Sequence, residues 1–393
     1  MQQMKKSTEI PILMKLIDGA LKNSNRDVVT LSHQIHENPE MSGEEFFARQ
    51  STIRLLDRYG FNLDATQPEA PTAFSMRKGT GQLVVTLCVE YDALPNIGHA
   101  CGHNVNAAAS VAAAIALSTI CDELDITVHV LGTPAEESHG GKIDLLNDGF
   151  FSTSHLAMMV HASGQDTIGN SSLALNAWDI TYRGKAAHAA AAPELGTNAL
   201  DAANIAQHAI ALARQQLPMK SIISLIVMQA GHSVNVIPDE STLRIEMRAP
   251  NIDQLTVINQ KVRNCLTAGA IASGCQLHIQ ERGNTFAELR QDSFLSSAYA
   301  TALSERGRQA VFDSTPVAST DMGNVSLAVP SIHPMIGYDV QTASHHSKEF
   351  ALYGTTAQAD TAIIDAAYAL AGAVVRAATD THQRTRLLER IES

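Results

Sequence analysis

The chain has 393 residues, of which 45% are hydrophobic and 17% are charged, and its formal net charge is −12 at pH 7. This length exceeds what one ordinary core organises, so two domains are expected, and the apolar content excludes a disordered chain. The negative charge argues against nucleic acid and against an anionic membrane surface as partners.

The N-terminal segment and the cysteines indicate a cellular compartment. Met1 to Ser24 contains lysines but no continuous apolar core and no small-residue cleavage site, so no secretory signal is expected. No run of about 18 apolar residues free of charge is evident, so no membrane-spanning helix is expected. The five cysteines are odd in number and scattered, which favours a reducing cytoplasm over a disulfide scaffold.

Residues 26–60 are expected to form two helices. Apolar side chains between Val28 and Ile35 fall on one helical face. A second helix is expected from Glu44 to Tyr59, with Ser42 as its N-cap.

Three apolar segments then read as buried strands with helices between them. They are Leu83–Val89, the segment beginning at Ile126, and His155–His161. An Ala-rich helix over 104–124 and a shorter one over 141–151 separate them. This order predicts an α/β fold with a mainly parallel sheet, whose function lies at the carboxyl ends of the strands.

Ligand-type side chains follow all three predicted strands. The candidates are Cys101, His103, Glu136, Glu137, His161, and one of His345 or His346. Borderline metals such as Zn²⁺ accept Cys, His and carboxylate together. Since this set exceeds what one tetrahedral ion uses, it predicts two metals about 3.5–4 Å apart that share a water. One of the adjacent glutamates is expected to ligate while the other moves the proton from water to the leaving amine.

Each of these features has a structural alternative when taken alone. A Glu-Glu pair is usually a solvated turn, a Cys-Gly-His sequence usually packs, and a histidine that ends an apolar strand often caps backbone groups. Their occurrence together, after the strands of one α/β pattern, favours a metal site.

The pattern changes at about residue 176. Strands are expected over 177–183, 222–230, 242–248 and 276–280, and helices over 197–216 and 252–272. This βαββαβ order describes a ferredoxin-like α+β module with an antiparallel sheet, which can offer a face or edge to a partner subunit. We therefore expect a catalytic metal-binding domain over 1–175 and 287–393, with an inserted dimerisation or lid domain over 176–286. A long Ala-rich helix over 355–378 is expected to close the catalytic core, followed by a charged surface tail.

Four motifs give a specific resemblance. They are Glu90-Tyr-Asp-Ala-Leu-Pro with Gly98-His-Ala-Cys-Gly-His-Asn, Pro134-Ala-Glu-Glu, Gly184-Lys-Ala-Ala-His-Ala, and Ser319-Thr-Asp-Met-Gly-Asn-Val-Ser. Together, over roughly residues 26 to 378, the chain resembles the M20 family of metallopeptidases and aminoacylases. It is most similar to the amidohydrolase branch that includes the aminobenzoyl-glutamate hydrolases and the dipeptidases related to mammalian peptidase M20 domain-containing protein 2. Asn104, where many relatives have Asp, fits that branch.

The resemblance implies roles for residues of the predicted catalytic domain. Glu136 matches the general base, and Asp92 matches the acid that orients a site histidine. Glu90 replaces a His or Asp of other branches, so no ligand role is assigned to it. The implied metal ligands are Cys101, His103, Glu137, His161 and His346, with His345 as the alternative to His346.

The resemblance also implies roles in the inserted domain. His188 matches the histidine that reaches the active site of the partner subunit and donates to the oxyanion. Asn235 and Arg248 match groups that hold the substrate carboxylate.

The prediction from sequence is thus a cytoplasmic homodimeric hydrolase with two divalent metal ions per chain, Zn²⁺ before Mn²⁺ or Co²⁺. Metal-activated water, with a glutamate as general base, is expected to cleave the amide bond of small N-acyl amino acids or dipeptides. The alternatives are a hydrolase of a non-peptide aryl amide or amine on the same scaffold, and a non-catalytic binding module.

Overall fold

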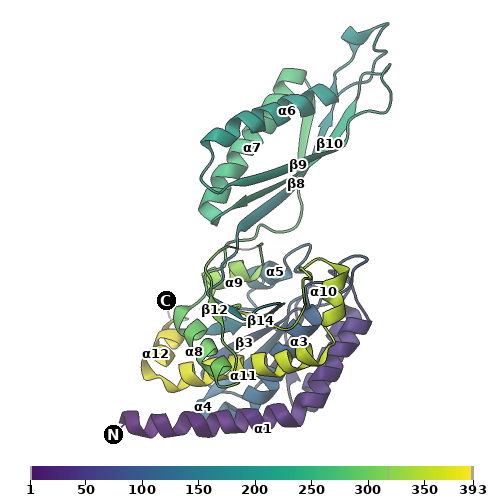
Figure 1. Cartoon of the computed structure of the whole chain (residues 1–393). Coiled ribbons are helices and arrows are strands. Elements are labelled where there is room, and N and C mark those ends of the chain that lie inside the picture. The colour runs from purple at the N-terminus through teal and green to yellow at the C-terminus, as the bar shows by residue number, and fades with distance from the viewer. Residues whose placement is uncertain (1, 317, 391–393) are drawn as a thin grey trace. The chain divides into compact units, whose positions relative to one another are not determined.

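The computed structural model describes residues 2–316 and 318–390, with side chains from residue 9 onward. Contacts divide the chain into two compact units (Figure 1). The first comprises residues 1–171, 289–317 and 321–393, and the second comprises residues 172–288 and 318–320.

The first unit is built on a six-stranded sheet of order β1-β2-β4-β3-β5-β13. Its strands are β1 (Asn62–Leu63), β2 (Phe74–Lys78), β3 (Leu83–Val89), β4 (Ile126–Gly132), β5 (Leu156–Met158) and β13 (Ser331–Ile332). Strands β4, β3, β5 and β13 are parallel neighbours, whereas β2 pairs antiparallel with β4 and β1 with β2. The α/β fold with parallel strands is therefore as the sequence predicted.

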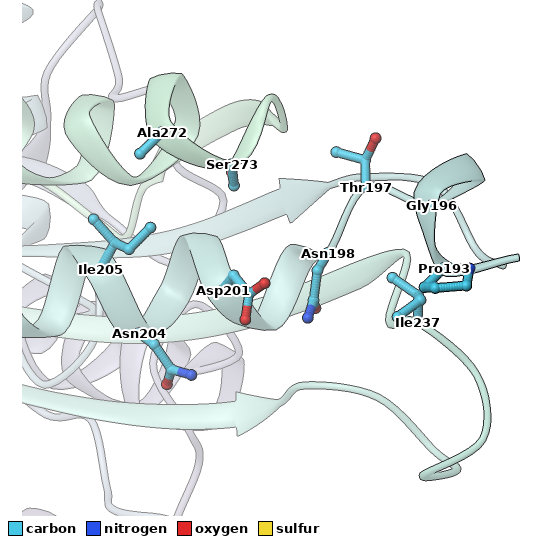
Figure 2. Close-up of a pocket in the computed structure, with 10 residues that line it drawn as sticks. All are labelled: Pro193, Gly196, Thr197, Asn198, Asp201, Asn204, Ile205, Ile237, Ala272 and Ser273. Atoms are coloured by element: carbon cyan, nitrogen blue, oxygen red, sulfur yellow. The ribbon is translucent and has the colours of Figure 1, made fainter. Parts of the chain in front are cut away.

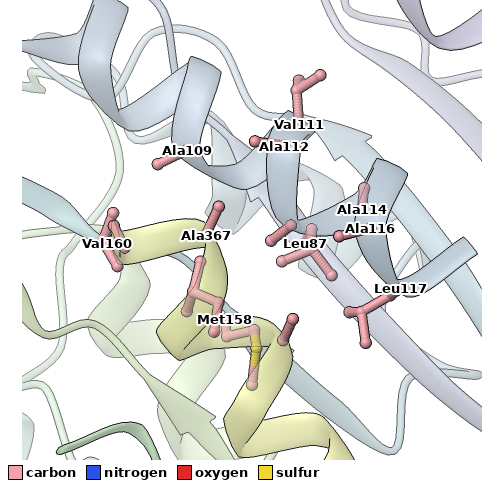
Figure 3. Packing of buried hydrophobic residues seen from close by; sticks show 14 of the residues in the cluster. Leu87, Ala109, Val111, Ala112, Ala114, Ala116, Leu117, Met158, Val160 and Ala367 are labelled. Atoms are coloured by element: carbon pink, nitrogen blue, oxygen red, sulfur yellow. The ribbon is translucent and has the colours of Figure 1, made fainter. Parts of the chain in front are cut away.

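Alanine-rich helices form the core of this unit. The helix α3 (His103–Leu117) is buried along its whole length and packs between α1 (Gln2–Glu37) and α11 (Ala357–Thr379). Figure 3 shows Ala109 and Ala112 of α3 and Ala367 of α11 in this packing, near Leu87 of β3 and Met158 of β5. Small side chains allow the backbones of these helices to approach one another closely, and such close packing leaves no room for water between them.

Other elements complete the first unit. The helices are α2 (Phe46–Arg58), α4 (Cys121–Leu124), α5 (Gly141–Asn147), α8 (Ser293–Ser304), α9 (Met322–Ala328), α10 (Lys348–Tyr353) and α12 (Thr381–Glu389), with a 3-10 turn at Ser118–Ile120. A small sheet has the order β12-β7-β14-β6, from β12 (Val311–Phe312), β7 (Thr167–Ile168), β14 (Met335–Gly337) and β6 (His161–Ser163).

The second unit is a four-stranded antiparallel sheet with two helices. The sheet order is β11-β8-β10-β9, from β8 (Ala174–Arg183), β9 (Ile222–Gln229), β10 (Glu240–Ala249) and β11 (Gln276–Glu281). The helices are α6 (Ala199–Ala213) and α7 (Ile252–Ser273), with 3-10 turns at Pro193–Leu195 and Arg214–Gln216. Burial alternates along β8 and β10, so one face of the sheet packs on the helices.

Capping side chains fix the starts of both helices of the second unit. Asn198 accepts a hydrogen bond from the Leu200 N–H before α6, and Asn251 accepts one from the Gln254 N–H before α7. Gly274, at φ 76°, ends α7 in the left-handed conformation.

Several expectations from sequence were wrong in detail. Ser42 does not cap α2; its hydroxyl donates to Asp92 Oδ2, at 2.7 Å, because a buried carboxylate is the stronger acceptor. The Glu40 carboxylate accepts from the Phe47 and Ala48 N–H groups instead. The segment 155–161, expected to be one strand, contains β5 and the start of β6. The charged tail, for which no secondary structure was expected, contains the helix α12.

Within residues 2–316 and 318–390, two helical stretches are long and apolar enough to cross a bilayer by composition, contrary to the expectation that none is. They are His103–Leu124 and Ala357–Thr379, and 94% and 83% of their most apolar windows are buried within the protein. This burial is what the core helices of a folded protein show.

Candidate metal and active centre

The loops after two neighbouring parallel strands supply the acids of the candidate centre. Glu90 and Asp92 follow β3, and Glu136 and Glu137 follow β4. Because β3 and β4 are parallel and in register from Leu83↔Ile126 to Val89↔Gly132, their carboxyl ends meet at one edge of the sheet. The alternation of strand and helix in the sequence therefore places four carboxyl groups together.

Asp92 connects three parts of the centre. Its carboxylate accepts hydrogen bonds from His103 Nδ1 at 3.0 Å, from the Glu137 N–H at 3.0 Å and from the Ser42 hydroxyl at 2.7 Å. Burial raises the pKa of this carboxyl, but the hydrogen bond and attraction from His103 outweigh it, and the pKa is lowered overall. Asp92 thus fixes both the ring of His103 and the backbone that carries Glu137.

His103 begins α3 and directs its second ring nitrogen at carboxylates. Nε2 lies 3.1 Å from Glu90 Oε1 and 3.8 Å from Glu137 Oε1, yet it is buried without a hydrogen bond of good geometry. Burial lowers the pKa of His103, and attraction to Glu90 and Asp92 raises it well above its ordinary value. A buried ring nitrogen with no hydrogen-bond partner, facing oxygen ligands, is the arrangement that a bound cation satisfies.

A tight turn brings Cys101 and His103 to the same centre. The intervening Gly102 has φ 70°, and a Cβ there would lie 2.4 Å from Ala162 Cβ. Only glycine fits this approach of backbone to β6. The Cys-Gly-His spacing therefore has a steric cause in the fold.

Cys101, Glu137 and His346 form one group of potential ligands. One potential ligand atom of each lies within 4.8 Å of the others. Burial and the negative charges of Glu137 and Glu136 raise the pKa of the Cys101 thiol, so a nearby cation is needed to hold it as thiolate. Glu137 also belongs to a group with His103 and Glu136: its Oε1 lies 3.8 Å from His103 Nε2 and its Oε2 lies 3.7 Å from His346 Nε2.

His161 lies among other imidazole rings. Its Nδ1 donates to the Ala162 carbonyl at 2.9 Å, and one of its ring nitrogens forms a group of potential ligands with Glu90 and His103. Burial and the neighbouring histidines, His345 first, hold the pKa of His161 well below its usual range. Neutral imidazole is the form that ligates metal.

The two histidines of the late polar loop have different surroundings. His345 Nε2 donates to the Ala162 carbonyl at 2.8 Å, and its ring lies against Phe350. His346 has φ 63° and belongs to the group with Cys101 and Glu137. His345 also lies near a candidate ligand, since its ring centroid is 5.4 Å from that of His161, but of the two only His346 belongs to a group of three potential ligands.

Glu136 sits on a strained turn beside these groups. Ala135 adopts φ 60°, which is unusual for a residue with a Cβ, and its N–H donates to the buried Glu45 carboxylate at 2.8 Å. One oxygen of Glu136 lies within 4.8 Å of ligand atoms of His103 and Glu137. Burial, then repulsion by Glu90, raises the pKa of Glu136 well above its ordinary value.

Three residues to which the sequence assigned no role also lie here: Lys142, Asp321 and His333. Lys142 is fully buried and bonds to Glu90 and Asp321. His333 is buried with neither ring nitrogen hydrogen-bonded, and its ring lies 5.6 Å from that of His161. The sequence shows a lysine shortly after the Glu136-Glu137 pair, which could have drawn attention to Lys142. Its partners, Glu90 and Asp321, lie in distant segments of the chain and could not be found in this way.

The remaining predicted residues lie in the second unit. His188 and Asn235 are neighbours, since the Ala189 N–H donates to the Asn235 carbonyl and His188 pairs with Val236. They follow the Arg183 end of β8 and precede the Glu240 start of β10. Arg248 lies near the other end of β10, where it donates to Glu246 and to the Ser319 hydroxyl.

The second unit also contains a separate cavity of about 520 Å³. Figure 2 shows it along the first turns of α6, with the N-cap Asn198, with Asp201 and Asn204 from the helix, and with Ile237 near Pro193. None of the predicted site residues lines it.

Comparisons with known proteins point to one family. Residues 174–273 match the Peptidase dimerisation domain. The chain is 35% identical to the Xaa-Arg dipeptidase of Mus musculus over 88% of this chain and 84% of that protein. It is 27% identical to a p-aminobenzoyl-glutamate hydrolase polypeptide of Escherichia coli (strain K12) over 66% of this chain and 58% of that protein. A dinuclear metal binding peptidase from the M20 family of Bacillus subtilis has the same fold, with a TM-score of 0.69 at 20% identity, covering 90% of this chain and 98% of that one.

Proposed function

Since the chain belongs to the M20 family of metallopeptidases and amidohydrolases, we propose that it hydrolyses the amide bond of dipeptides or small N-acyl amino acids. The observation that carries this proposal is that Glu136 and Glu137 form one group of potential ligands with His103, while Glu137 also belongs to a second group with Cys101 and His346. The name of the 35% identical relative supports dipeptides that end in arginine as the first substrates to test.

We propose that the centre holds two divalent metal ions. The donor set fits them, because it combines a buried thiol, imidazoles and carboxylates with the unpartnered Nε2 of His103. Cys101, His103, Glu137, His161 and His346 would hold the ions, with Zn²⁺ favoured by the thiol and Mn²⁺ or Co²⁺ as alternatives. Bound ions would supply Lewis acidity to the substrate carbonyl and lower the pKa of the attacking water.

The side chains of this protein would then direct the protons. Glu136 would accept the proton of the attacking water and deliver it to the leaving nitrogen. Asp92 would keep His103 and Glu137 in place through the hydrogen bonds described above. His188 would donate to the developing oxyanion, and Asn235 and Arg248 would bind the substrate carboxylate.

A homodimer is part of this proposal. Eight residues separate Glu240 from Arg248 along β10, or about 27 Å at ~3.4 Å per residue. His188 and Asn235 lie beyond the Glu240 end, so a pocket that uses all three residues needs a second copy of the chain. The β9 strand offers an edge for pairing, and its exposed apolar residues include Ile226 and Met228.

We place the enzyme in the cytoplasm. All five cysteines are buried free thiols, which is the usual state in a reducing compartment.

The proposal is tested by metal content and hydrolysis together, for the wild type, Glu136→Gln and the exposed control Glu123→Gln. The substrate panel contains dipeptides with arginine or other C-terminal residues, N-acyl amino acids and p-aminobenzoyl-glutamate. Glu136→Gln should keep its metal while turnover falls about 10²–10⁴-fold, and Glu123→Gln should match the wild type. A metal-free wild type that stays inert after addition of Zn²⁺, Mn²⁺ or Co²⁺ would overturn the proposal.

A second candidate reaction is hydrolysis of an aryl amide. The similarity to the p-aminobenzoyl-glutamate hydrolase polypeptide favours it. Preferential cleavage of p-aminobenzoyl-glutamate over every dipeptide in the panel would select this reaction.

A further inference from the structure

A fully buried lysine lies among the acids behind the candidate ligands. Lys142, in the first turn of α5, has a side chain with 0% exposure, and so does Asp321, while that of Glu90 is 1% exposed. Lys142 Nζ lies 2.5 Å from Glu90 Oε2 and 2.7 Å from Asp321 Oδ1. The backbone N–H of the same residue donates to Asp321 Oδ2 at 2.9 Å. Asp321 is thus bound by both the side-chain ammonium and the backbone N–H of Lys142.

The acids around Lys142 would otherwise form a cation site. One oxygen from each of Glu90, Glu136 and Asp321 lies within 4.8 Å of the other two. Three carboxylates at this separation in a water-poor interior repel one another strongly unless a cation lies between them. The structure supplies that cation from its own chain.

The distances from Lys142 Nζ to the carboxylate oxygens can be compared with those of two kinds of cation. Ammonium–carboxylate hydrogen bonds are about 2.7–2.9 Å long, whereas Zn²⁺–carboxylate bonds are about 2.0–2.2 Å. The Asp321 oxygen, at 2.7 Å from Nζ, lies within the ammonium range, and the Glu90 oxygen, at 2.5 Å, lies closer to that range than to the metal range. Glu90 is fixed further by Asn106, whose amide donates to Oε1 at 3.2 Å while its carbonyl accepts from the Ala162 N–H at 2.8 Å.

We propose that the Lys142 ammonium is a permanent cation of this centre, which excludes metal from the site formed by Glu90, Glu136 and Asp321 and positions Glu90 against His103. The proposed metals are then confined to Cys101, His103, Glu137, His161 and His346. Lys142 is a positioning residue: it fixes which carboxylates are available to metal and does not itself contact substrate. This inference rests on the metal centre of the proposed function.

The test counts metal ions in the folded protein. The wild type, Lys142→Met and Lys142→Met/Asp321→Asn are dialysed against Zn²⁺ or Mn²⁺, and bound metal is measured by plasma mass spectrometry. Methionine has a similar length but no charge, so Lys142→Met should bind about one more ion than the wild type. The double variant lacks one of the freed carboxylates and should return to the wild-type number. A folded Lys142→Met with the wild-type number overturns the proposal.

A second variant keeps the test decisive if Lys142→Met does not fold. Asp321→Asn leaves the ammonium paired with Glu90, so its metal content should equal that of the wild type. Loss of an ion from Asp321→Asn would show that Asp321 ligates metal and would overturn the proposal. A metal-free wild type would instead contradict the proposed function, while a gain of metal in Lys142→Met would still support the role of Lys142.

Discussion

Each unit contains a cluster of three charged side chains, and the two clusters differ in their exposure to water. In the first unit, Lys142 lies between Glu90 and Asp321, and no side chain of the three is more than 1% exposed. In the second, Asp179 lies between Arg244 and Arg282 on the open face of the sheet, with exposures of 39–43%. Water solvates the second cluster and screens it, while the first depends entirely on its own partners. We therefore expect loss of a charged side chain to be costly in the first cluster and nearly neutral in the second.

The strands explain why the units differ. In β3 six of seven residues are buried, because helices cover both faces of its sheet. In β10 buried residues alternate with partly exposed ones, because helices cover one face only. The first unit can therefore enclose charged groups beyond its strand ends, whereas the second presents a face and the β9 edge to solvent.

The largest expected effect comes from removing the buried cation. In the presence of a chelator, Lys142→Met should lower the free energy of unfolding by about 3–5 kcal/mol, because it removes the cation that Glu90 and Asp321 share in a buried site. Urea unfolding followed by circular dichroism measures this loss. The control is Lys22→Met, since Lys22 pairs with Asp18 on the surface of α1 and is 73% exposed. If Lys142→Met lowers the free energy of unfolding no more than Lys22→Met does, burial does not make the Lys142 cluster more important than an exposed ion pair.

A buried neutral group should produce a pH dependence in the first unit. His129 Nε2 donates to the Ser75 hydroxyl, which itself donates to Asp64, and Nδ1 accepts from Thr86. Burial, with Arg77 nearby, lowers the pKa of His129 from 6.5 to about 3. The unfolded chain therefore binds a proton below pH 6.5 that the folded protein excludes, so the stability from this group is present above pH 6.5 and is lost as the pH falls towards 3.

The variant His129→Gln isolates this contribution. Between about pH 6 and pH 4 its unfolding free energy should decline less steeply than that of the wild type, by up to ~1.4 kcal/mol per pH unit. The exposed His382→Gln serves as control and should keep the wild-type slope. Parallel pH profiles for the wild type and His129→Gln would contradict the assignment.

A charged substitution on the exposed edge strand of the second unit should weaken self-association without affecting the folding of the subunit. Ile226 on β9 is 56% exposed, and a lysine there would place a charge in any pairing across this edge. Ile226→Lys should weaken self-association about 10–100-fold, given ~1.5–3 kcal/mol for a buried isoleucine, with unfolding of the subunit nearly unchanged. Sedimentation equilibrium measures the change, and Val257→Lys, on the exposed side of α7, is the matched control. Equal dissociation constants for the two variants would exclude β9 from the dimer interface.

Much of this organisation was predictable from sequence, because it depends on local patterns. The apolar run before Glu90, the alternation over 242–248 and the change in pattern near residue 176 identify strands, sheet type and a second module. The candidate ligands follow strands, and parallel pairing brings such positions together. Lys142, His333 and Asp321 escaped assignment because their contacts join segments far apart in the chain. Ser42 was misassigned because a hydroxyl near a helix start was expected to bond locally, while a buried carboxylate lay within reach.

The smallest expected effect is at the exposed cluster. The Arg244 hydrogen bond lowers the pKa of Asp179, but both side chains are well solvated. Asp179→Asn should therefore cost less than about 1 kcal/mol, and added salt should reduce that cost further. A double-mutant cycle with Arg244→Gln, measured by urea unfolding at low and high salt, isolates the coupling between the two residues. A coupling above about 2 kcal/mol that persists in high salt would mean that a surface ion pair can match a buried one, and exposure would no longer explain the difference between the units.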